Sequence, residues 1–261
     1  MNVGQLKFIE THCHLDYLKD KPLDVILDLA TQAQVEKIIT IAVSKDNLQQ
    51  VLEIGKSYSQ VFVTQGIHPH SAKDAGPEIF KTIQQNIQDN KKVVAVGEIG
   101  LDYHYDNSPR DIQRQIFESQ LQLACELDLP VVIHSRDAEE DTIDILNNFL
   151  PRLKKRGVIH SFTSKINLAE FVLKHDFMIG FNGIITFINA HNVRLAVEIT
   201  PVENIVFETD APFLTPEPNR GKENGPYYLP LVAQKVAELK SMPLEEIAQI
   251  VYQNSHRLFN L

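Results

Sequence analysis

The sequence predicts a closed (β/α)8 barrel, the TIM-barrel fold, from three observations. Short apolar runs rich in Val and Ile alternate with longer segments of helical periodicity, and this alternation repeats about eight times. The chain has 261 residues, and a barrel of this kind needs about 250, so one domain spanning residues 1–261 is expected. The turn after the first apolar run carries histidines, whereas an open doubly wound sheet usually has a Gly-rich phosphate loop there.

Each expected strand is one of the apolar runs. The eight expected strands are Leu6–Ile9, Lys37–Ala42, Val61–Gly66, Val93–Gly97, Pro130–Ile133, Gly157–His160, Phe177–Gly180 and Ile205–Glu208. Segments with helical spacing include Leu23–Ala33, Asn47–Tyr58, Ile79–Asn90, Asp111–Leu127 and Thr142–Leu150. The tail is expected to form an eighth helix, Leu229–Lys240, and one additional helix, Leu244–Tyr252.

The composition is that of an ordinary globular protein, with 43% hydrophobic and 23% charged residues. No apolar run approaches the roughly 20 residues that span a bilayer. The start, Met1–Lys7, lacks the basic and apolar regions of a signal peptide. We therefore expect a cytoplasmic protein without a membrane partner, as a monomer or weak oligomer.

Charge and cysteine content restrict the partners and the metal chemistry. A net charge of -9 argues against long-range attraction to a polyanion, so a nucleic-acid substrate would be gripped locally, at an end. Cys13 and Cys125 are far apart in the sequence, which indicates neither a disulfide nor a thiolate zinc site. Any bound metal is therefore expected to have nitrogen and oxygen ligands.

His12 and His14 stand at the end of the first apolar run. In a strand, residues two apart point to the same face about 6.6 Å from each other, so both imidazoles would face one metal ion. Cys13 would then point the opposite way. A His-x-His pair alone is equally consistent with two exposed polar residues, and the rest of the chain decides between the two interpretations.

Six ionisable residues follow or end the expected strands. They are His12, His14, Glu98, His134, His160 and Asp210. Each alone has an ordinary explanation as a helix cap or a loop residue, but all six fall on the rim where barrel enzymes build their sites. Zn, Mn and Mg accept such ligands, and the set suffices for two divalent ions bridged by a shared carboxylate.

Five segments resemble the signature blocks of the TatD metal-dependent hydrolases, which belong to the amidohydrolase superfamily: His12–Asp16, Gly97–Tyr103, Ile133–Arg136, His160–Thr163 and Glu208–Pro212. The resemblance extends from Ile9 to Phe259. It implies that His12, His14 and Asp210 hold one ion and that His134 and His160 hold the other, with Glu98 between them.

The resemblance also implies hydrolysis of a phosphodiester at a single-stranded DNA or RNA end, as in a 3′–5′ exonuclease, by water activated between two metal ions. Asp210 and Glu98 are the expected catalytic residues, with Asp210 accepting the proton of the water and Glu208 supporting it. One alternative is an ester or amide hydrolase, such as a D-aminoacyl-tRNA deacylase. Another is a catalytically silent metal-binding scaffold, although a structural site would ordinarily close with four ligands.

Four further residues are expected to contact the substrate, each with an alternative. His68 follows the third expected strand, and it is otherwise a turn histidine stiffened by Pro69. Arg220 and Lys222 would neutralise a phosphate, or form a solvated loop pair. Arg136 points into the mouth, or else pairs with a neighbouring carboxylate. Histidines expected to be structural are His104, His175, His191 and His256.

Three positions depart from the family pattern. Glu10 stands where the family usually has Asp, and this change is expected to affect how the neighbouring histidines are oriented. Ser164 replaces a permissive Gly on a rim loop. Glu223 and Gly225 stand where the family's loop often has a basic and an acidic residue, and this difference bears on substrate preference.

Overall fold

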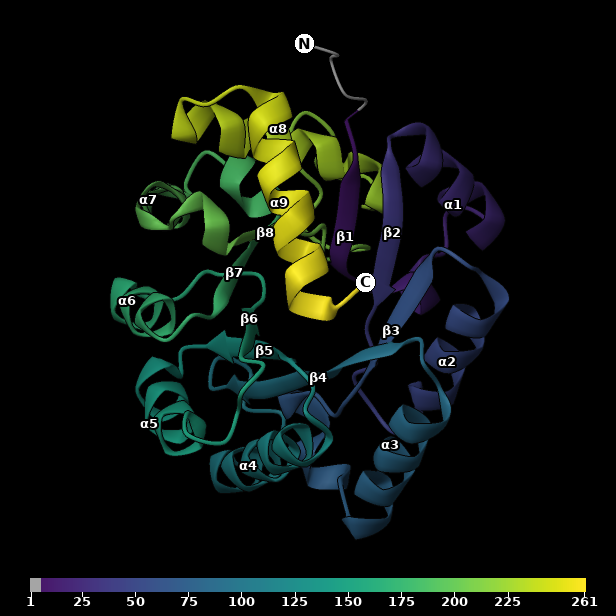
Figure 1. Cartoon of the computed structure of the whole chain (residues 1–261), viewed down its shortest axis with the longest axis vertical. Helices are drawn as coiled ribbons and strands as arrows, with labels where there is room; N and C mark the ends of the chain where they lie inside the picture. The colour runs from purple at the N-terminus through teal and green to yellow at the C-terminus, as the bar shows by residue number, and fades with distance from the viewer. Residues whose placement is uncertain (1–5) are drawn as a thin grey trace.

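The computed structural model describes residues 6–261, in which eight parallel strands form one sheet in the order β1 to β8. The strands are β1 Phe8–Cys13, β2 Val35–Thr40, β3 Val61–Gln65, β4 Val93–Asp102, β5 Val131–Arg136, β6 Gly157–Ile159, β7 Met178–Phe181 and β8 Ile205–Phe207. The strands form a ring inside a layer of helices (Figure 1). The predicted TIM-barrel fold is confirmed.

The helices of the described chain follow the strands in alternation. They are α1 Leu23–Gln32, α2 Leu48–Ser57, α3 Pro77–Asp89, α4 Arg110–Leu127, α5 Glu139–Phe149, α6 Ile166–Lys174, α7 His191–Ile199, α8 Leu229–Lys240 and α9 Leu244–Phe259. Short 3-10 helices are η1 Leu15–Tyr17, η2 Pro69–Asp74, η3 Gly183–Thr186, η4 Val202–Asn204 and η5 Pro226–Tyr228. The additional helix at the end is confirmed, and it continues beyond Tyr252 to Phe259.

Two strands are longer than the apolar runs that predicted them. β1 continues from Ile9 to Cys13, and β4 continues from Gly97 to Asp102. Every residue of both strands is buried, the polar ones included. The polar ends stay in the sheet because they pair with neighbouring strands, as Asp102 does with Arg136. The apolar runs end before the strands do, because a pattern of hydrophobic residues gives no sign of polar residues that are buried at a site.

The barrel is covered at its amino-terminal end by α9. Leu258 and Phe259 pack in one cluster with Val94, Val158 and Val206 at the starts of strands. The Asn254 side chain donates hydrogen bonds to Val202 O in η4 and to Ile205 O at the start of β8, each over 2.8 Å. Figure 1 shows α9 lying across the ring. Solvent therefore reaches the strands from the opposite, carboxyl end.

At the carboxyl end, the segment after β8 bonds to β1 and draws the ring together. Asp210 N donates to His12 O over 2.9 Å, and His14 N donates to Ala211 O over 2.7 Å. These bonds bring residues from the two ends of the chain to one rim.

Residues 1–5, which include most of the Met1–Lys7 start and belong to the predicted domain, lie outside the described residues. Among residues 6–261, no helix combines the length and apolar character that crossing a membrane requires. Both cysteines are free thiols.

Candidate metal centre

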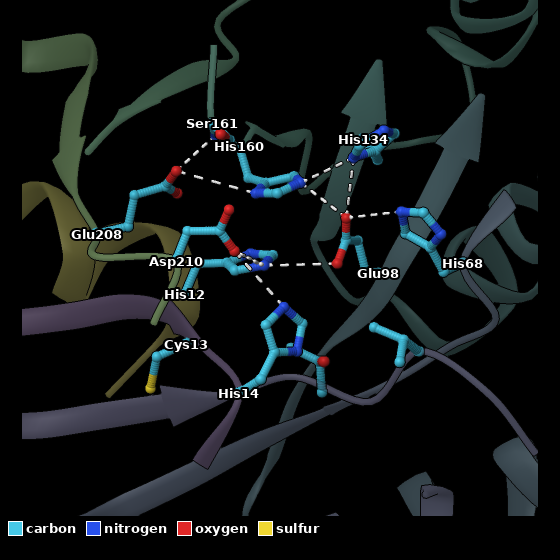
Figure 2. Close-up of polar contacts among 12 residues, drawn as sticks. His12, Cys13, His14, His68, Glu98, His134, His160, Ser161, Glu208 and Asp210 are labelled. Atoms are coloured by element: carbon cyan, nitrogen blue, oxygen red, sulfur yellow. Dashed lines mark hydrogen bonds and ion pairs between the residues drawn. The ribbon is translucent and has the colours of Figure 1, made fainter. Parts of the chain in front are cut away.

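The six predicted ligands meet at the carboxyl rim, where Figure 2 shows their polar atoms facing one another. They are His12 in β1, His14 after β1, Glu98 in β4, His134 in β5, His160 after β6 and Asp210 after β8. Cys13, between the two histidines, points away, and its Sγ lies 3.8 Å from Ile39 O in the core. The opposite orientation predicted for Cys13 is confirmed, because neighbouring strand residues face opposite sides.

One cluster is formed by His12, His14 and Asp210. Asp210 Oδ1 lies 3.6 Å from His12 Nε2 and 3.5 Å from His14 Nε2. Glu98 Oε2 lies 3.5 Å from the same His12 nitrogen. Asp210 Oδ1 thus lies near the Nε2 atoms of both histidines, and Glu98 Oε2 lies near that of His12.

A second set surrounds the other carboxylate oxygen of Glu98. Oε1 lies 2.7 Å from His160 Nε2, 3.1 Å from His134 Nδ1 and 3.3 Å from His68 Nε2. His68 was predicted to contact substrate, and the structure places it among these potential ligands. Its imidazole is mostly buried beside Glu98.

The separations of 3.5 to 3.6 Å in the first cluster fit ligands around a divalent ion better than hydrogen bonds. Ligand atoms about 2.1 Å from a tetrahedral ion are about 3.4 Å from each other, close to the separations in the first cluster. Buried imidazole nitrogens without hydrogen-bond partners include His12 Nδ1 and Nε2 and His160 Nδ1. Because buried polar atoms are normally satisfied, these atoms indicate that the rim is built for a cation.

The protonation states differ between the residues of the site. Burial lowers the pKa of His12 to about 4, helped by the neighbouring His160, and burial likewise lowers the pKa of His68 to about 4. Burial opposes the charge on Glu98, but the surrounding imidazoles outweigh it and hold the pKa of its carboxyl well below the usual range. Neutral imidazoles and an ionised carboxylate are the forms that bind metal.

In Asp210 and His134, burial and the neighbouring charged groups likewise shift the pKa in opposite directions. Burial disfavours the charged Asp210, but its contact with His14 lowers the pKa below the usual value. Burial also disfavours the charged His134, but Asp102 and Glu98 raise its pKa to about 9. A cation binding at His134 must therefore displace a proton.

Asp102 supports the second cluster and was not singled out from the sequence. Its Oδ2 lies 3.0 Å from His134 Nε2 and 3.1 Å from His70 Nε2, so it orients His134 Nδ1 toward Glu98. Asp102 lies four residues after Glu98, on the same face of β4, and this spacing is the signal that would have found it. Between them, Gly100 has φ +135°, and an added Cβ would lie 2.0 Å from His134 O.

Glu208, the predicted support for Asp210, faces His160 instead. Its Oε1 lies 3.9 Å from His160 Nδ1 and accepts a hydrogen bond from the Ser161 amide. Burial raises the pKa of Glu208 well above the usual range, and the nearby charge of Asp210 adds to the shift.

The three departures from the family pattern each have a structural contact. Glu10 Oε1 accepts hydrogen bonds from the amides of His12, at 3.0 Å, and Thr209, at 2.9 Å, so it fixes backbone on both sides of the first cluster. Ser164 Oγ donates to Ser135 O over 3.1 Å. The Glu223 carboxylate accepts two backbone hydrogen bonds from the loop after η1.

The basic residues predicted to bind substrate lie outside the clusters. The Arg220 guanidinium lies 3.9 Å from the centroid of the Phe187 ring, and Arg136 lies 5.0 Å from that of Tyr105. Lys222 Nζ donates to Asn219 Oδ1 within its own loop. The four histidines expected to be structural, His104, His175, His191 and His256, take no part in the clusters of the described chain.

Comparison with known proteins identifies the family. The sequence profile described as "TatD related DNase" matches residues 9–260. The chain belongs to the TatD family. This TatD-family chain is 39% identical to the uncharacterized metal-dependent hydrolase YabD of Bacillus subtilis (strain 168), over 97% of this chain and 98% of the relative. It is 30% identical to the uncharacterized metal-dependent hydrolase TatD of Mycobacterium tuberculosis, over 97% and 98%.

Structural comparison agrees. The crystal structure of YjjV, a TatD homolog from Escherichia coli K12, superposes with a TM-score of 0.91 at 33% identity, covering 97% of this chain and 98% of that one. The predicted family is thus confirmed. This TatD-family protein is a metal-dependent hydrolase, and its His, Glu and Asp clusters fit divalent metal binding.

Proposed function

We propose that this protein hydrolyses a phosphodiester at an unpaired end of DNA or RNA with the help of two divalent ions. The observation that carries the proposal is the position of Glu98. Its Oε2 faces His12 in one cluster, and its Oε1 faces His134 and His160 in the other. One carboxylate between two ligand sets is the arrangement of a two-ion phosphodiesterase, and the family's description as a DNase supports this class.

The ligand sets would hold the two ions on either side of Glu98. Bound divalent ions make a water more acidic and stabilise the oxygens that enter and leave at phosphorus. The ionised carboxylate of Asp210, beside His12 and His14, would orient the attacking water and accept its proton. His68, beside Glu98 and partly accessible to solvent, would contact the water or a phosphate oxygen.

The charge of the molecule favours an end as the place of attack. With a net charge of -9, the protein has no excess of positive charge to neutralise the phosphates of a long nucleic-acid backbone. Binding would therefore rest on a few contacts near the rim. Such binding depends weakly on salt, because few counterions are released. Arg136 and Arg220, held against aromatic rings, are the cations proposed to contact phosphates.

The test compares substrates on one preparation loaded with Zn, Mn or Mg. End-labelled single-stranded DNA and RNA, aminoacyl-tRNA, an aryl phosphate diester and an aryl carboxylate ester are assayed together. We expect mononucleotides to be released from the unpaired ends, and chelation of the metal to abolish the release. Asp210→Asn serves as the control for contaminating nucleases. Activity that belongs to this protein should fall in the variant, whereas activity from a contaminant should stay the same.

Each alternative has its own outcome in this test. Rapid nicking of closed circular duplex DNA, or a salt dependence that indicates six or more phosphate contacts, would refute attack at ends. Turnover of only the carboxylate ester or aminoacyl-tRNA would replace the nuclease with an esterase or deacylase. If fully metal-loaded protein turned over none of these substrates, the catalytically silent metal-binding scaffold would be the remaining interpretation.

A further inference from the structure

Two aromatic rings stand exposed beside the first cluster, and the proposed catalytic steps use neither. Tyr17 is 37% exposed and Phe213 is 51% exposed. The Tyr17 ring is stacked at 19° on the His14 ring, with 5.2 Å between centroids, and Phe213 meets His14 edge-on at 6.2 Å. Solvent-facing rings beside the same potential ligand are an apolar surface next to a charged centre.

The exposure of Phe213 is imposed by a tightly held turn. Phe213 N donates to Asp210 O over 2.9 Å, and the fully buried Asn224 donates from Nδ2 to Phe213 O and, over 2.8 Å, to Thr209 O. Leu214, the next residue, has φ +58°, a conformation that non-glycine residues rarely adopt. A rigid turn therefore holds the ring in solvent next to Asp210.

The Tyr17 ring is held in a similar way. Tyr17 is the last residue of η1, and Leu15 N in the same 3-10 helix donates to the buried Thr40 Oγ1 over 3.1 Å. Asp16 Oδ2 accepts a hydrogen bond of 3.0 Å from Asn47 Nδ2. These bonds fix the backbone of the turn that carries Tyr17, and the ring itself is stacked on His14.

Glu223 connects the two loops that carry the rings. It follows the Phe213 turn in sequence, and its Oε1 and Oε2 accept from the amides of Lys19 and Asp20, each at 2.9 Å, just beyond Tyr17. The carboxylate therefore fixes the loop of one ring relative to the loop of the other. This acidic residue is also one of the departures from the family pattern.

We propose that Tyr17 and Phe213 form a stacking subsite for a nucleobase of the nucleotide whose phosphodiester is cleaved. The inference rests on the proposed function and adds the part of the substrate that is recognised. Every base offers a π-face to an aromatic ring, so such a subsite selects for the presence of a base and tolerates its sequence. Preorganised rings order little on binding, so more of the stacking energy appears as affinity.

The experiment measures binding, separately from turnover. Metal-loaded protein is titrated by calorimetry with a phosphorothioate-linked single-stranded trinucleotide and with three analogues, each abasic at one position. Base stacking on aromatic side chains is worth about 5- to 150-fold in affinity, so one abasic analogue should bind more weakly by that factor. Phe213→Leu and Tyr17→Leu should lose this preference, and Tyr17→Phe, which keeps the ring, should retain it.

Two controls keep a structural effect apart from a stacking effect. Leu195→Ala changes an exposed apolar residue on α7, outside the rim clusters, and should leave the preference unchanged. Metal content is measured for every variant, because Tyr17 touches His14. Phe213→Leu, at the more exposed ring, decides the proposal if Tyr17→Leu loses metal.

The outcomes for the subsite and for the proposed hydrolysis differ. Equal binding of intact and abasic trinucleotides, or a base preference undiminished in Phe213→Leu, overturns the subsite. A base preference without hydrolysis of any end supports the subsite and refutes the nuclease activity. Hydrolysis without a base preference supports the nuclease activity and refutes the subsite. Failure of every trinucleotide to bind refutes the subsite, and the proposed hydrolysis is then judged by the release of mononucleotides from labelled ends.

Discussion

Asp210→Asn separates a role in metal binding and catalysis from a role in folding. The substitution keeps the shape of the side chain and removes the charge that faces His12 and His14 at 3.6 and 3.5 Å. Loss of a general base costs about 10²–10⁴-fold in rate. We therefore expect kcat to fall at least about 100-fold at a saturating metal concentration.

The effect on stability should appear only when metal is present. At a metal concentration of about 100 times Kd, binding stabilises the folded state by about 2.7 kcal/mol. If the neutral amide weakens Kd about 100-fold, the same concentration contributes only about 0.4 kcal/mol. For a chain of this size the difference of about 2.3 kcal/mol corresponds to roughly 5–9 °C in Tm.

Without metal, the Tm of the variant should stay close to that of the wild type. Burial raises the pKa of Glu208 and of Glu10, and the Asp210 charge adds to both shifts by like-charge repulsion; its removal relieves this repulsion, which offsets the loss of its favourable contact with His14. Tm with and without metal, bound metal and rate are measured on one preparation. Asp137→Asn, at an exposed carboxylate after β5, is the matched control and should change none of them.

Two results would refute this reasoning. An undiminished rate at saturating metal would remove Asp210 from the mechanism. A Tm that falls equally with and without metal would assign Asp210 a structural role.

Three further substitutions test other parts of the structure. Gly100→Ala places a Cβ about 2.0 Å from His134 O at φ +135°, so bound metal and Tm should both fall; normal metal content would contradict the close approach. Glu223→Gln weakens a hydrogen bond to the η1 loop and should raise KM more than it lowers kcat in steady-state assays, whereas an unchanged KM would separate this link from substrate binding. Phe117→Ala, in the fully buried core, should cost about 3–5 kcal/mol in denaturant unfolding, with kcat of the folded enzyme unchanged; a smaller cost would mean that the core collapses around the cavity.

Sequence periodicity by itself determined the fold class. Alternating apolar runs and amphipathic segments are local properties, and a parallel sheet of eight such units has few ways to close. The same logic placed His12, Glu98 and Asp210 on one rim, because the carboxyl ends of parallel strands point the same way. Local patterns could not show that β1 and β4 continue through buried polar residues, since those residues are tolerated only where partners surround them.

Tertiary structure alone decided which side chains meet across the rim. Asp102 reaches His134, and Glu223 ties its loop to the chain beyond Tyr17, through contacts between residues far apart in sequence. Arg220 stacks on Phe187, a contact between two loops that the sequence did not show. The physical reason is that sequence spacing sets the direction of a side chain on its own strand or helix, while the distance between two loops depends on the packing of the whole barrel.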